Sequence, residues 1–180
     1  MKKYELTKET KTLADGTVLH RIRALMDISR YGVKSGDLGG WVEKYDNLSQ
    51  DGDAWVSDNA WVSDDAWVYG NAKVSGNACV SDDAKVYGNA KVYGDADVYG
   101  DAEVSGNDDY MVIKNIWSSG RSFTYTRSNK MWKVGCFYGT GEELVKKTYA
   151  DSELSGRCYE AIVRAVETIE SAKAEAKARK

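Results

Sequence analysis

The chain has 180 residues, of which 42% are hydrophobic and 29% are charged, and its net charge is −3. This length suits one or two domains, and no stretch is apolar enough to predict a membrane span, so we expect a soluble, cytoplasmic protein. Three widely spaced cysteines and one histidine exclude a disulfide framework and a Cys/His metal site, so we expect no metal and no cofactor.

Charge is distributed unevenly along the chain. Residues 48–109 include thirteen acidic and three basic residues, whereas residues 110–180 include thirteen basic and eight acidic residues. The acidic segment repels nucleic acid, so we do not expect duplex nucleic acid to be a partner.

Residues 1–40 predict a small β unit. Residues 3–7 and 17–28 have strand character, and Ala14-Asp15-Gly16 predicts the turn between them. His20 falls on the apolar side of the second strand, with Val18, Ile22 and Met26. It could be a catalytic or ligand-contacting residue, but we favour a packed, hydrogen-bonded side chain beneath the segment that follows.

Nine consecutive units of six residues occupy positions 54–107. Each unit has Ala first, Val third, Gly or Asp fifth, and Asn or Asp sixth. One valine per unit predicts a short strand whose valine points inward, and the closing pair tolerates a left-handed backbone, which predicts a turn. Glycine or a β-branched residue in every unit excludes a helix.

This period resembles the hexapeptide-repeat family, whose fold is a left-handed parallel β-helix with three units per coil. The resemblance implies three coils, with residues 48–53 as a degenerate tenth unit. The entry segment, residues 36–43 (GDLGGWVE) and 47–49, resembles that of uncharacterised hexapeptide-repeat proteins of bacteria and phages. We therefore expect a mainly β fold with an N-terminal β cap (residues 1–40), the β-helix (41–107) and a C-terminal α+β domain (108–180).

The second position of each unit is predicted to face outward. Tryptophan occupies it in the first three units, and tyrosines follow at the fourth position of later units. Exposed aromatic side chains favour an interface with the N-terminal unit or a neighbouring subunit, and the alternative is a carbohydrate or base platform. We expect a homotrimer or a multiple of one, with interface residues Trp55, Trp61, Trp67, Tyr87, Tyr93 and Tyr99.

Two enzyme classes share the resembled fold, and neither suits this chain. Acyltransferases of this fold use a histidine from the coil as general base, and the carbonic anhydrase branch binds zinc through three histidines. Residues 21–180 contain no histidine. We therefore expect a protein that is not an enzyme.

Residues 108–180 predict a β-meander followed by two helices. Strands are expected at 110–117, 122–127 and 131–138. Thr140 and Glu143 form a capping box for a helix through Tyr149, and a longer helix is expected from about Ser155, with a frayed end at 172–180. Residues 135–140 and 142–144 resemble small phage-encoded domains.

The meander is the most favourable place for a ligand. Between Tyr110 and Tyr138 there are five basic residues, seven aromatic residues and no acidic residue, a combination that suits stacking with a flat ring and phosphate binding. We assign Trp132 and Phe137 to the core of the sheet. The candidate ligand-binding residues are Arg121, Tyr125, Arg127, Lys133, Tyr138 and Thr140. Alternatively, the two arginines pair with acidic turns of the array and dock the two modules.

These patterns favour a non-catalytic, oligomeric binding protein of phage origin that sequesters a small anionic, nucleotide-like molecule. The first alternative is a structural scaffold for assembly or protein interaction. The second is a hexapeptide-repeat acyltransferase, which the missing coil histidine disfavours.

Overall fold

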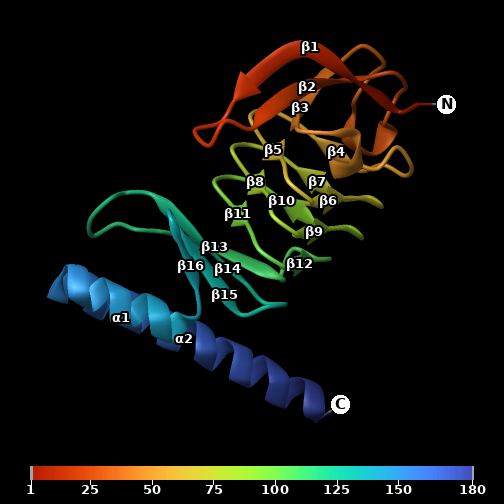
Figure 1. The fold of residues 1–180 in the computed structure, drawn as a ribbon. Coiled ribbons are helices and arrows are strands. Elements are labelled where there is room, and N and C mark those ends of the chain that lie inside the picture. The colour runs from red at the N-terminus through yellow and green to blue at the C-terminus, as the bar shows by residue number, and fades with distance from the viewer. Residues whose placement is uncertain (1, 180) are drawn as a thin grey trace.

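A computed structural model describes residues 2–179. The chain builds an N-terminal hairpin, a coil of short parallel strands, an antiparallel sheet and a pair of helices, which follow one another in space as they do in sequence (Figure 1). The fold is mainly β, with a β-solenoid at its centre and both α-helices at the C-terminal end.

The N-terminal unit is a hairpin that extends onto the coil. Strands β1 (Tyr4–Thr12) and β2 (Val18–Ala24) pair antiparallel, β2 pairs with β3 (Leu38–Val42), and β3 continues in parallel to the coil strand β5. The predicted inward positions of Val18 and Met26 are wrong, because these side chains are 44% and 43% exposed. Register shifts in the β1–β2 and β2–β3 pairs break the alternation of inward and outward side chains along β2. Met26 lies beyond the end of β2.

Within the array every unit forms a two-residue strand at its second and third positions. These strands are β4 (Trp55–Val56), β5 (Trp61–Val62), β6 (Trp67–Val68), β7 (Lys73–Val74), β8 (Cys79–Val80), β9 (Lys85–Val86), β10 (Lys91–Val92), β11 (Asp97–Val98) and β12 (Glu103–Val104). The nine valines are completely buried and the alanines almost completely, as predicted. Eight units have a positive φ at the fifth position, and the exception is Gly106, where the chain leaves the coil.

The strands stack on three faces: β3, β5, β8, β11 on the first, β4, β7, β10 on the second, and β6, β9, β12 on the third. Val62 pairs with Val80, eighteen residues later, whereas Val42 pairs with Val62, twenty residues later. Leu48 forms a parallel bridge with Val68, so it takes the valine position. The expected tenth unit starting at Leu48 is therefore wrong in register, because the first turn contains two additional residues.

The direction of the backbone hydrogen bonds determines which polar groups are left unpaired at each end of the coil. The N–H of each level donates to a carbonyl of the next level, as from Trp55 to Ala72, so carbonyl groups are left over at the start of the coil and N–H groups at its end. At the start, the Lys3 ammonium donates to the Ala54 carbonyl (2.8 Å) and the Tyr4 hydroxyl to that of Leu48 (2.8 Å).

At the other end, side-chain oxygens accept from one N–H on each face. The Asp97 N–H donates to Thr124 Oγ1 (2.8 Å) on the first face. On the second face the Lys91 N–H donates to Asn107 Oδ1 (2.8 Å), and on the third the Glu103 N–H donates to Ser128 Oγ (2.7 Å). Both ends of the coil are thus covered by groups that complement the unpaired backbone.

The C-terminal sheet contains four antiparallel strands, β13 (Tyr110–Lys114), β14 (Ser122–Thr126), β15 (Met131–Val134) and β16 (Phe137–Gly139). The single strand expected over 131–138 is therefore two strands, because Gly135, with φ of 56°, turns the chain between them. Strand β13 ends early because the Asn115 carboxamide accepts hydrogen bonds from the backbone N–H groups of Trp117 and Ser118.

Two helices follow the sheet, α1 (Gly141–Asp151) and α2 (Glu153–Ala178). The capping box is confirmed: Thr140 Oγ1 accepts from the Glu143 N–H, and the Glu143 carboxylate accepts from the Thr140 N–H at 2.8 Å. Helix α2 continues to Ala178, so the expected fraying from 172 onward is not observed as far as that residue.

The sheet has two covered faces. Met111, Phe123 and Trp132 pack with Tyr159 and Val163 of α2 in a core separate from that of the coil. The opposite face, which includes Tyr110, Val112 and Thr124, lies against the last coil level. Alternate residues of each strand consequently point to different neighbours.

Candidate functional site

A groove runs along the first coil face, between the β1–β2 turn and the β15–β16 turn. Its volume is about 410 Å³. We call it the side groove. Its lining residues are Asp15, Trp61, Ser63, Asp64, Ser81, Asp82, Asp97, Tyr99, Lys133 and Gly135.

The repeat places the floor of the side groove. Because β5, β8 and β11 stack in parallel register, Trp61, Cys79 and Asp97 form one column of side chains. The fourth positions of the same units, Ser63 and Ser81, are both buried and follow the inward valines. The walls come from outside the array, with Asp15 on one side and Lys133 and Gly135 on the other.

The floor is acidic. Burial raises the pKa of the Asp97 carboxyl, and the nearby Lys133 ammonium partly offsets this. Burial likewise raises the pKa of Asp82, and the neighbouring carboxylates of Asp83 and Asp64 add to the effect. Unlike these two, Asp64 receives hydrogen bonds from the Ser63 hydroxyl (2.8 Å) and the Asp82 N–H (3.3 Å).

Lys133 is the principal cation of the side groove. Its Nζ lies 3.9 Å from the centroid of the Tyr99 ring, a cation–π contact. Tyr138 packs edge-on against Tyr99, with ring centroids 5.0 Å apart, and its hydroxyl donates to Asp101 (3.4 Å). Burial and the Asp101 carboxylate raise the pKa of Tyr138 to about 12, so this phenol is neutral at physiological pH.

The six predicted ligand-binding residues do not form one site. Tyr125 is 6% exposed and packs on Trp132 in the core beneath α2, and Arg127 lies on the same face of the sheet. Lys133 and Tyr138 pair across β15 and β16 on the opposite face, towards the coil. Of the six, only Lys133 lines the side groove.

Arg127 already has carboxylate partners. Its Nε lies 3.0 Å from both oxygens of Glu170 on α2, and its Nη1 lies 3.4 Å from Asp108 and 3.9 Å from Asp109. Although residues 110–138 contain no acidic residue, Arg127 has counter-charges, because the sheet packs it beside α2 and the end of the array. The alternative that it docks neighbouring modules agrees with these contacts.

Arg121 and Thr140 stand apart from this network. Arg121 is exposed, next to a smaller depression of about 260 Å³ that also borders Tyr159. Thr140 is the N-cap of α1, so its hydroxyl already has a structural partner in the Glu143 backbone. Neither residue lines the side groove.

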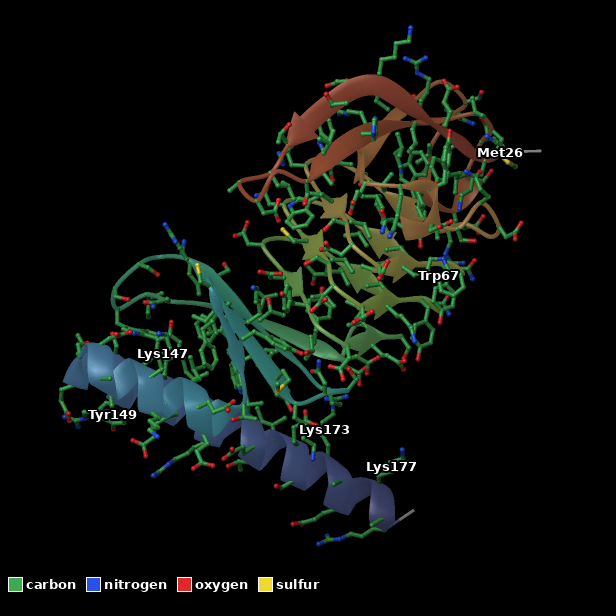
Figure 2. The ribbon with its side chains drawn as sticks, in the orientation of Figure 1. Met26, Trp67, Lys147, Tyr149, Lys173 and Lys177 are labelled. Atoms are coloured by element: carbon green, nitrogen blue, oxygen red, sulfur yellow. The ribbon has the colours of Figure 1, made fainter. Side chains whose placement is uncertain are left out.

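The predicted interface residues do not share one environment. Trp55 is 1% exposed and lies beside Gly39 of β3, so of the two expected coverings the N-terminal unit, and not a neighbouring subunit, agrees with its position. Trp61 and Tyr99 line the side groove. Trp67 is 42% exposed and stacks on Tyr69, with ring centroids 4.0 Å apart. Figure 2 labels Trp67 at the side of the coil.

Tyrosines extend this aromatic surface. Tyr69 stacks in turn on Tyr87, with ring centroids 5.1 Å apart and planes inclined by 7°. We call Trp67, Tyr69 and Tyr87 the aromatic column. Tyr93 is 60% exposed and borders a separate depression of about 410 Å³ together with Tyr110.

Sequence reasoning missed the serines and aspartates of the side groove. The repeat pattern alone does not single out Ser81, Asp82 and Asp97. Aligning positions of the array that are eighteen residues apart, one coil level each, places Trp61, Cys79 and Asp97 on one face. The contributions of Asp15 and Gly135 had no comparable signal, because the position of a hairpin turn beside a distant strand depends on the tertiary fold.

The single histidine of the chain lies outside the side groove. His20 is half-buried on β2, with its Nδ1 3.4 Å from the Thr7 carbonyl oxygen, and is not part of the groove lining. Within residues 2–179 no group of three or more His, Cys, Asp or Glu side chains is arranged to hold a metal ion. Across the same residues, neither helix is both long and apolar enough to cross a membrane.

In comparisons with known proteins, no family model and no curated sequence matches the chain.

Proposed function

We propose that this is a non-catalytic binding protein that captures a small molecule in the side groove. The single observation that carries the proposal is the groove itself, because three separate parts of the chain converge on a volume typical of small-molecule sites. Trp61 and Tyr99 supply aromatic surface, and the aspartates and Ser81 supply polar groups that can orient a ligand.

The proposal keeps the predicted binding role and changes its location. Capture of a nucleotide on the meander would need the arginines and aromatic residues on one open surface. Arg127 is instead paired with Glu170, and Tyr125 is buried. Sequestration of a signalling nucleotide by a phage-derived protein stays a prediction, and the first experiment below includes nucleotides.

The first experiment compares two tryptophans. The purified protein is incubated with a pool of cellular small molecules that includes nucleotides, and native mass spectrometry identifies what stays bound. Trp61→Ala should weaken retention about tenfold, because aromatic surface on the floor of the groove is removed. Trp67→Ala, a matched change on another coil face, should retain the same compound. Empty spectra, or equal retention by both variants, would contradict the proposal.

Assembly is a second candidate function, favoured by the aromatic column. A ladder of stacked rings with Trp67 exposed leaves an apolar surface on the third coil face, and symmetric association buries such surfaces. We therefore keep the homotrimer, or a multiple of it, as a proposal. A ligand site and an assembly surface are compatible, since they lie on different faces.

We propose that the coil is left-handed, as the resemblance to hexapeptide-repeat proteins implies, and that the N-terminal hairpin is its dedicated cap. The complementary contacts of Lys3 and Tyr4 with the first coil level support the capping role.

A further inference from the structure

We infer that the side groove selects a small organic amine, bound as a cation, rather than an anionic molecule; this inference rests on the proposed capture function. Three carboxylates from successive coil levels, Asp64, Asp82 and Asp97, line the groove. Within residues 2–179 none of the three takes part in an ion pair closer than 4 Å.

A second, independent feature is the Ser81 hydroxyl. Ser81 is 5% exposed and lines the groove, yet in the described part of the chain its side chain has no hydrogen-bond partner. The neighbouring Ser63, one coil level away, donates to Asp64 at 2.8 Å. Because the Ser81 hydroxyl faces the groove and no protein group within residues 2–179 engages it, it is available to hydrogen-bond with a bound molecule.

The protein's own lysine shows how a cation fits this site. Lys133 Nζ lies 3.9 Å from the centre of the Tyr99 ring, and its charge counteracts the pKa increase of Asp97. The ammonium of Lys133 therefore occupies part of the environment that a ligand amine would use, with an aromatic face on one side and a carboxylate nearby. Trp61 offers the remaining apolar surface for the body of the ligand.

This arrangement makes Lys133 a competitor of an amine but a partner of an anion, so one substitution separates the two classes. Lys133→Met keeps most of the unbranched side chain and removes its charge. For an amine, removing a like charge from the groove should increase affinity about fivefold. For a phosphate-bearing anion, the same change removes the principal cation of the site and should greatly weaken binding.

Isothermal titration of the full-length protein tests this with tyramine and spermidine as amine probes, and AMP and glucose as anionic and neutral probes. We expect an amine to bind, Lys133→Met to strengthen its binding, and Asp97→Asn to weaken it at least tenfold, the loss expected for a charge-assisted hydrogen bond. Thermal melts check that both variants are folded. Amine affinity should also fall as salt is raised.

Preference for AMP or glucose, or amine binding that weakens in Lys133→Met, would overturn the inference while leaving capture in the side groove intact. Failure of the proposed function is recognised separately, because the wild-type protein would then retain no compound from the cellular pool.

Discussion

Lys3 places an ammonium group among backbone carbonyls that the first coil level leaves without strand partners. Its side chain is 2% exposed, and Nζ donates to the carbonyls of Ala54 (2.8 Å), Gly52 (3.3 Å) and Asp51 (3.4 Å). Burial lowers the pKa of Lys3 to about 8, although the carboxylates of Asp53 and Asp51 oppose this shift. The charged side chain thus satisfies the end of the coil at an electrostatic cost.

This pKa predicts how stability depends on pH. Between the folded value near 8 and the ordinary value of 10.5, the unfolded chain binds more protons than the folded chain, so the free energy of unfolding should rise with pH. The contribution of Lys3 to this rise should be about 2–3 kcal/mol. Lys3→Met, which cannot titrate, should lack it.

Urea unfolding at intervals between pH 7.5 and 10.5 measures the effect as the difference between wild type and variant. Burial raises the pKa values of Tyr4 and Cys79, and these shifts lower the free energy of unfolding as the pH rises. Because both proteins contain these residues, the difference between the two proteins removes their contribution. Parallel curves for the two proteins would show that Lys3 is not responsible.

At the scale of elements, the C-terminal sheet joins the coil to the helices. Its coil-facing side supplies Thr124 and Lys133, and its helix-facing side supplies Phe123, Tyr125 and Trp132. Arg127 contacts Glu170 of α2 and Asp108 after the array. Lys173 of α2, which Figure 2 labels, reaches the same Asp108 carboxylate at 3.4 Å.

Arg127→Ala should therefore destabilise the protein rather than reduce ligand binding. Its guanidinium is partly exposed, so we expect a loss of about 1–2 kcal/mol after allowance for solvent screening, mainly from the unpaired Glu170. Arg121→Ala is the matched control, because Arg121 is exposed and should change the melting temperature little.

Thermal melts and titration with the captured compound, on the same preparations, separate the two roles. A folded Arg127→Ala variant that keeps its melting temperature but no longer binds the compound would show that Arg127 belongs to the ligand site.

At the scale of the whole molecule, the three coil faces have different surroundings. The first face forms the floor of the side groove, whereas the third face carries the aromatic column, with Trp67 42% exposed. A surface of stacked aromatic rings on a regular parallel coil suits repeated contact with identical subunits.

We expect light scattering at micromolar concentration to give the mass of a trimer or of a multiple of three chains. Trp67→Asp should shift the protein towards the monomer, because it places a charge within the apolar contact. Leu154→Asp, at an even more exposed apolar position near the start of α2, should leave the mass unchanged. A monomeric wild type, or dissociation only in the Leu154 variant, would show that the aromatic column does not mediate assembly.

The sequence by itself determined the features that depend on neighbouring residues. A six-residue period with one valine, one small residue and one left-handed turn predicts short strands with inward valines, and its resemblance to hexapeptide-repeat proteins implies that they stack as a parallel coil. The same holds for α1, because Thr140 and Glu143 are only three residues apart and complete their capping box without the rest of the protein.

Only the tertiary structure decided which functional residues meet. Arg127 and Glu170 are 43 residues apart in the sequence. Lys133 reaches Tyr99 because the tight turn at Gly135 and the pairing of Lys133 with Thr124 place its side chain on the coil-facing side of the sheet. A shift of one residue in that register would move Lys133 to the helix side, since successive side chains of a strand point to opposite faces. Charge and aromatic content therefore identified the meander as unusual but could not show that its two faces serve different neighbours.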